Sequence, residues 1–153
     1  MMKRTLLAIG LFVTILNGAM AADAKWAICK TYVNVRQEPS TKSEIIGRLY
    51  CGDGVQTEEQ KNGWIYCIDL PFEFSHGWVC AGYLTDDCPV YTDSWYQVTG
   101  NGRVALRKEV SGKIVGWVRP GDVLKIQWIS SEWALTEKGQ YIKSEFLEGQ
   151  EEA

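Results

Sequence analysis

The chain has 153 residues, with 16 Lys and Arg against 19 Asp and Glu, and a formal net charge of −3. A nucleic-acid-binding protein needs clustered basic residues to contact the phosphate backbone. This acidic balance therefore excludes nucleic acid as a partner.

The N-terminus has the features of a secretion signal. Lys3 and Arg4 precede an apolar run, Leu6 to Leu16, and small residues around Ala19 to Ala21 offer a cleavage site. The run is far shorter than the roughly 20 residues that span a bilayer, and no later segment is apolar enough to do so. We predict a signal peptide at residues 1–21. Its removal leaves 14 basic and 19 acidic residues, a net charge of −5, in a periplasmic or secreted protein with no membrane span.

After the signal, short segments of alternating polarity recur between turn residues, which is typical of all-β proteins. Val33 and Val35 alternate with polar neighbours, and Val104 and Leu106 repeat this pattern. The dipeptide Asn62-Gly63 between two such segments predicts a tight β-hairpin. Almost nothing beyond residue 24 indicates a helix.

One irregular motif occurs twice, which indicates two copies of a small domain. The first copy comprises Val33-Asn34-Val35-Arg36, Ile46-Gly47, Gly63-Trp64 and Gly77-Trp78-Val79 with Tyr83-Leu84. The second comprises Val104-Ala105-Leu106-Arg107, Val115-Gly116, Glu132-Trp133 and Gln140-Tyr141-Ile142 with Phe146-Leu147. We expect domains at residues 25–88 and 89–148 and a disordered tail at 149–153. The connection between the domains is short enough that we expect them to touch.

All five cysteines lie in or beside the first copy: Cys29, Cys51, Cys67, Cys80 and Cys88. Domains of about 60 residues bury little surface and gain from cross-links in an oxidising compartment. We therefore expect one or two disulfide bonds. Spacing does not fix the pairing, although terminal strands lying side by side would make Cys29 and Cys88 a plausible pair.

The motif order resembles the bacterial SH3-like (SH3b) domain family, closely in the first copy. The second copy departs at Ala105, at Val110 (where the first copy has Pro39), at Glu132 and at Tyr141. The resemblance implies two tandem, small, partly open SH3-like barrels of five to six strands each. It also implies that the region of Tyr83 and Phe146 borders a ligand groove.

Few residues offer catalytic chemistry. The single histidine, His76, could in principle act as base for Cys51, Cys67 or Cys80, but we interpret the cysteines as structural and the protein as non-enzymatic. Cysteine spacing does not match a zinc finger, and the glycine-rich runs do not open a helix that could hold phosphate. We expect neither a metal nor a cofactor.

Aromatic residues are abundant, with seven Trp and seven Tyr. We interpret Trp64 with Trp133, and Trp78 with Tyr141, as shared barrel packing because they recur in both copies. Trp128 aligns with Glu59, so the fold does not require an aromatic residue there, and Trp128 is a candidate ligand contact.

The first copy has six additional residues before its last strand, and they contain Phe72 and Phe74 close to His76. An exposed apolar cluster of this kind typically marks an interaction site. An equally good explanation of this apolar cluster is that it covers the other domain. We take Phe72, Phe74 and His76 as candidate ligand contacts, together with Tyr83, Trp128 and Phe146.

These observations favour an exported binding module that recognises cell-wall (peptidoglycan) peptides or an envelope protein. The alternative is a secreted or periplasmic protein–protein adaptor or inhibitor that acts through the Phe72–His76 hairpin.

Overall fold

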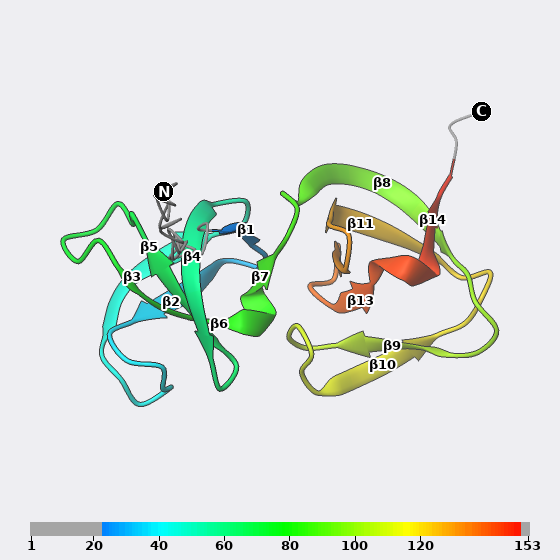
Figure 1. The fold of residues 1–153 in the computed structure, drawn as a ribbon. Coiled ribbons are helices and arrows are strands. Elements are labelled where there is room, and N and C mark those ends of the chain that lie inside the picture. The colour runs from blue at the N-terminus through cyan, green and yellow to red at the C-terminus, as the bar shows by residue number, and fades with distance from the viewer. Residues whose placement is uncertain (1–22, 151–153) are drawn as a thin grey trace, which may run out of the picture.

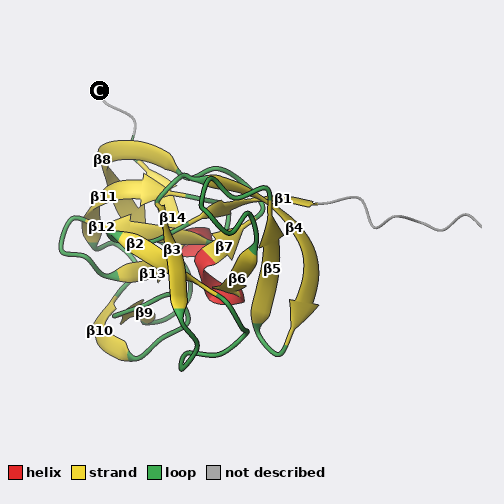
Figure 2. Cartoon of the chain, turned by 90° about the vertical axis from the view of Figure 1, so that its left-hand side faces the viewer, coloured by secondary structure: helices red, strands yellow, loops and turns green. Residues whose placement is uncertain are grey.

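The structure, a computed structural model, describes residues 23–150. The predicted signal peptide, residues 1–21, and the last three residues of the predicted tail lie outside this range. Strands and loops form nearly all of the described chain, with two short helical turns (Figure 2). The all-β prediction is confirmed. Within the described range, no helix is long and apolar enough to cross a membrane.

The strands form two antiparallel sheets that lie side by side as two units (Figure 1). The first unit contains β1 (Asp23–Ala27), β2 (Tyr32–Arg36), β3 (Ile45–Tyr50), β4 (Gly54–Lys61), β5 (Trp64–Ile68), β6 (Gly77–Cys80), the 3₁₀ turn η1 (Ala81–Tyr83) and β7 (Leu84–Thr85). Its strand order is β3-β2-β6-β5-β4-β1-β7. This order leaves β3 and β7 as edges, as expected of a partly open barrel.

The second unit contains β8 (Val90–Val98), β9 (Val104–Arg107), β10 (Ile114–Val118), β11 (Val123–Ile129), β12 (Trp133–Thr136), β13 (Tyr141–Lys143), the turn η2 (Ser144–Phe146) and β14 (Leu147–Gly149). Its order, β10-β9-β13-β12-β11-β8-β14, follows the first sheet strand for strand. Each sheet has seven strands, where the resemblance implied five to six. The additional strands include β7 and β14, which follow the 3₁₀ turns and are too short to give an alternating pattern.

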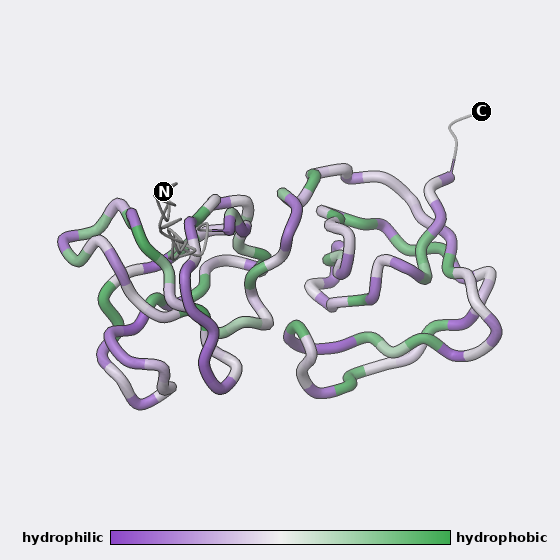
Figure 3. The backbone as a smooth tube through the Cα atoms, in the orientation of Figure 1, coloured by the Kyte–Doolittle hydropathy of each residue, from purple (hydrophilic) through white to green (hydrophobic). Residues whose placement is uncertain are grey.

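Each unit has its own apolar core, formed by the side chains that point inward from alternate strand positions. Both valines of β2, Val33 and Val35, are buried in the first core. Val104 and Leu106 of β9 are buried in the second. Hydrophobic stretches accordingly occur along the strands of both units, separated by hydrophilic ones (Figure 3).

The predicted hairpin joins β4 to β5 through Asn62-Gly63. Both residues have positive φ, 50° for Asn62 and 82° for Gly63. Two positive φ angles define the turn whose twist matches that of the flanking strands, and Asn-Gly favours it because both residues tolerate this conformation. The hairpin prediction is confirmed.

A third apolar cluster joins the two units. Ile28, which follows β1, is 1% exposed and packs with Trp128, Trp133 and Tyr141 of the second unit. Asp87, in the connection between β7 and β8, fastens the junction: its carboxylate accepts hydrogen bonds from the Ser131 backbone N–H at 2.8 Å and from the Ser131 hydroxyl at 2.6 Å.

The expected disulfide bonds are not present: all five cysteines, each within the described residues, are free thiols. Cys29, the proposed partner of Cys88, is buried, and its thiol interacts with that of Cys51 instead. Cys67 is fully buried in the first core and behaves as a small apolar residue. The first core is therefore closed by packing rather than by cross-links.

Gly77, the first residue of β6, lies where a side chain does not fit. A Cβ atom there would lie 2.6 Å from Val35 Cγ1 and 2.9 Å from Ile46 Cδ1, inside the first core. Overpacking of this kind costs typically about 1–3 kcal/mol. We therefore expect Gly77→Ala to lower the free energy of unfolding by about that amount in urea denaturation. Gly102→Ala is the control, because no atom lies within 4 Å of its Cβ position. Equal urea midpoints for the two variants would contradict this account.

The thiols of Cys51 and Cys67 differ in environment. Hydrogen bonding from Cys29 lowers the pKa of Cys51, whereas burial raises the pKa of Cys67 to about 12. Because the thiolate is the reactive form, we expect iodoacetamide at neutral pH to label Cys51 well before Cys67 in the folded protein. Peptide mapping by mass spectrometry measures the order, and labelling in urea is the control, where the difference should vanish. Faster labelling of Cys67 in the folded protein would contradict the described burial.

Candidate functional site

A groove opens in the first unit beside strand β2. This strand pairs with β6 at Arg36, opposite Trp78. Continuing that register would place Asn34 opposite Cys80, but these residues do not pair among the described strands. The space between them belongs to a cavity of about 440 Å³. Its lining residues are Cys29, Lys30, Thr31, Tyr32, Val33, Asn34, Arg36, Thr41, Trp64, Cys80, Tyr83, Glu109 and Tyr141.

Strand alternation determines which side chains face this groove. Val35 points into the core and is fully buried, so Asn34 and Arg36 point outward on the same face of β2. Trp64 on β5 lies directly opposite Cys80 on β6 and shares their side of the sheet. Arg36 is held in place because its Nη1 donates a hydrogen bond to the Ser43 carbonyl at 2.7 Å.

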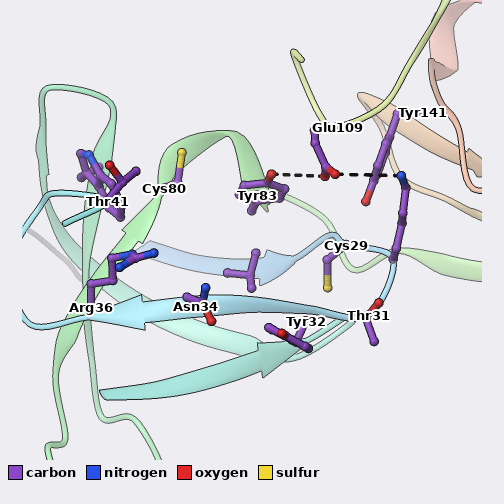
Figure 4. A pocket seen from close by; sticks show the side chains of 13 residues that line it. Cys29, Thr31, Tyr32, Asn34, Arg36, Thr41, Cys80, Tyr83, Glu109 and Tyr141 are labelled. Atoms are coloured by element: carbon purple, nitrogen blue, oxygen red, sulfur yellow. Dashed lines mark hydrogen bonds and ion pairs between the residues drawn. The ribbon is translucent and has the colours of Figure 1, made fainter. Parts of the chain in front are cut away.

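The second unit closes the other end of the groove. The Tyr83 hydroxyl donates a hydrogen bond to Glu109 Oε2 at 3.3 Å, and the ammonium of Lys30 lies 4.0 Å from Glu109 Oε1. Lys30 also donates to the Lys108 carbonyl at 2.6 Å and lies over the Tyr141 ring, 5.3 Å from its centroid. Figure 4 shows Arg36 at one end of the groove and Glu109 with Tyr141 at the other.

The polar groups of the groove are unequally satisfied. Burial, with the nearby Glu109 carboxylate, raises the pKa of Tyr83 to about 12, and burial also raises the pKa of Tyr141. Both hydroxyls therefore stay protonated at neutral pH. Within residues 23–150, the buried atom Asn34 Oδ1 in this groove has no hydrogen-bond partner. An unsatisfied buried polar atom costs about 1–3 kcal/mol, so a ligand that pairs with this atom would bind more tightly.

The second unit has a smaller groove at the equivalent place. It has a volume of about 240 Å³ and is lined by Val104, Ala105, Arg107, Ser111, Trp133, Lys143 and Phe146. Arg107 pairs opposite Tyr141 as Arg36 does opposite Trp78, and its Nη1 likewise donates to a carbonyl, that of Gly112, at 2.7 Å. The two grooves are therefore counterparts.

The residues predicted as ligand contacts do not form one site. Tyr83 lines the first groove and Phe146 lines the second. Trp128 is 1% exposed in the cluster that joins the units, so it has no accessible face. Only the second unit has an aromatic residue at this position, because the second unit packs there against Ile28 of the first.

The Phe72–His76 hairpin is also divided. The Phe72 ring packs on the first core and covers Gly47. Phe74 is 49% exposed, and the His76 ring lies 5.7 Å from that of Tyr66. The hairpin therefore folds partly over its own unit and leaves Phe74 in solvent.

Sequence reasoning missed Asn34, Arg36, Trp64 and Glu109 as groove residues. The repeat motif contained the first three, but recurrence in both copies led us to interpret Trp64 as barrel packing. In the structure Trp64 is absent from the core cluster and lies on the outer face of the sheet. The contribution of Glu109 depends on how the two units dock, which the motif alone does not reveal.

Comparison with known proteins bears on the first unit. Residues 31–85 match the family model of the bacterial SH3 domain. No curated protein sequence matches the chain. One similar solved structure is that of NlpC1 from Trichomonas vaginalis, with a TM-score of 0.37 and 12% identity over 84% of this chain and 46% of that one. The present chain thus spans less than half of that protein's length. In the present chain the first unit provides most of the groove, and its residues 31–85 belong to the bacterial SH3 domain family.

Proposed function

We propose that this protein is an exported, non-enzymatic binding module whose first groove holds an extended peptide of the cell wall or of an envelope partner. The observation that carries the proposal is the buried, unpartnered polar atom Asn34 Oδ1 in that groove. Folded proteins rarely leave such atoms unsatisfied, and those that remain call for an explanation. A ligand that supplies the missing hydrogen bond is the explanation we adopt.

The dimensions and chemistry of the groove suit a short peptide. A volume of about 440 Å³ is within the usual range of small-ligand sites, roughly 300–1,000 Å³. The half-buried Trp64 offers an apolar face, Arg36 places a positive charge at one end, and Glu109 beside Lys30 places both signs of charge at the other. A peptide has backbone donors and acceptors along its length and carries both signs of charge. It therefore complements this arrangement better than a uniformly charged or wholly apolar ligand.

Cell-wall peptides are the favoured source because of two independent features. The N-terminal sequence has the features of a secretion signal, which would bring the protein to the envelope. Bacterial SH3 domains are binding domains often found in cell-wall-associated proteins, and the first unit is one of them. The matching strand order of the second unit supports a tandem arrangement of two such domains.

The alternative function is that of an adaptor or inhibitor that docks through the Phe72–His76 hairpin. The exposed Phe74 ring favours this candidate, because it is 49% exposed although large and apolar. A protein partner recognised there would leave the groove unused.

Co-sedimentation with purified bacterial sacculi tests the groove. We expect the mature protein to pellet with sacculi and Trp64→Ala to weaken binding by about tenfold or more, as is usual for loss of a central aromatic contact. Trp95→Ala is the matched control, because Trp95 lies in the second unit and is 55% exposed outside the groove. Thermal melting verifies that both variants are folded.

Three outcomes separate the candidates. Loss of binding in Trp64→Ala alone supports the groove. Weakening by Phe74→Ala with Trp64→Ala unaffected would move the site to the hairpin. Wild-type protein that remains in the supernatant would refute wall binding.

A further inference from the structure

The two grooves differ at one pair of residues that lie opposite each other on adjacent strands. In the second unit, Trp133 on β12 pairs with Lys143 on β13. In the first, Trp64 on β5 pairs with Cys80 on β6. The tryptophan is common to both units, whereas the residue across from it changes from a long cation to a short thiol.

In the second unit the lysine occupies the tryptophan face. The Lys143 ammonium lies 4.4 Å from the centroid of the Trp133 ring, a favourable cation–π distance. No carboxylate is within ion-pair distance of Lys143 among the described residues. The ring is therefore the main electrostatic partner of this ammonium. Trp133 also packs with Ile28 in the cluster that joins the units and is only 3% exposed.

In the first unit the corresponding face is open. The Cys80 side chain ends at Sγ and provides neither the reach nor the charge of Lys143. Trp64 remains half-buried and lines the cavity of about 440 Å³, against about 240 Å³ for the second groove. The first groove thus has the aromatic receptor for a cation without a cation of its own at that position.

The first groove also has an amide and a carboxylate acceptor that the second groove lacks. Asn34, whose Oδ1 is buried and unpartnered within residues 23–150, corresponds to Ala105 in the second unit. Glu109 adds a carboxylate at the end of the same groove. An ammonium offers three N–H donors, so an aromatic face with an amide oxygen nearby and a carboxylate further along is suited to it.

We propose that the face of Trp64 beside Cys80 and Asn34 is a subsite for a primary alkylammonium group of the ligand. This inference rests on the proposed function, because it names the chemical group of the ligand that the first groove would hold. Lys143 shows within this chain how such a group sits on the equivalent ring. A lysine-like amine, with a pKa near 10.4 when free, is charged at neutral pH.

The test uses two small probes that differ in one group, Nα-acetyl-lysine N-methylamide and Nα-acetyl-norleucine N-methylamide. NMR titration of the mature protein follows the Trp64 indole N–H and the Asn34 side-chain amide. We expect saturable shifts with the lysine probe in the millimolar range and binding at least about tenfold weaker with the norleucine probe. This ratio corresponds to the contribution of a largely desolvated cation–π contact.

Substitutions at the differing position provide the matched variants. Cys80→Lys places in the first groove the residue found in the second, so it should abolish the response of Trp64 to the lysine probe. Cys80→Ala should preserve it. Melting temperatures establish that each variant is folded.

Equal binding of the two probes, or an unchanged response in folded Cys80→Lys, would overturn the inference. Sacculi whose amines have been acetylated separate this failure from that of the proposed function. Sacculi that bind equally well before and after acetylation would refute the amine subsite and leave wall binding standing. If untreated sacculi fail to bind while the lysine probe binds at Trp64, the subsite stands and its ligand comes from another source.

Discussion

The structure depends on the apolar cluster that joins its two units. Ile28 of the first unit is enclosed by Trp128, Trp133 and Tyr141 of the second. Burying one such aliphatic side chain contributes about 1.5–3 kcal/mol, and the large rings around it add more. Because this cluster fixes the second unit against the first, Glu109 is brought to the end of a groove that otherwise belongs to the first unit. The site is thus a property of the pair of units.

The opening of the groove is a local matter of strand pairing. Arg36 opposite Trp78, and Arg107 opposite Tyr141, mark the places where the second and sixth strands of each unit meet. Beyond these pairs the strands separate, and the exposed side chains decide what each opening can hold. In one unit a lysine covers the tryptophan, while in the other a cysteine leaves it accessible. Two units with the same strand order thereby present different surfaces.

Much of the fold could be predicted from the sequence, because alternation and turn chemistry act locally. Val33 and Val35 are buried as their alternation indicates, and Asn62-Gly63 forms the hairpin turn. The candidate site was predicted less well, since it depends on contacts between distant segments. Trp128 was predicted as a ligand contact because Glu59 stands at its counterpart, yet its exposure is set by the neighbouring unit. The disulfide expectation followed from compartment and domain size, neither of which determines whether two thiols form a bond.

The docking face of the second unit has a counterpart on the first. Across three paired strands the second unit presents Trp128, Leu135 and Tyr141, whereas the first presents Glu59, Tyr66 and Trp78. Another module that stacked on the first unit in the same way would enclose the Glu59 carboxylate at the centre of an apolar contact, which is strongly unfavourable without a cationic partner. The first unit thus lacks, at Glu59, the apolar face through which the second unit docks.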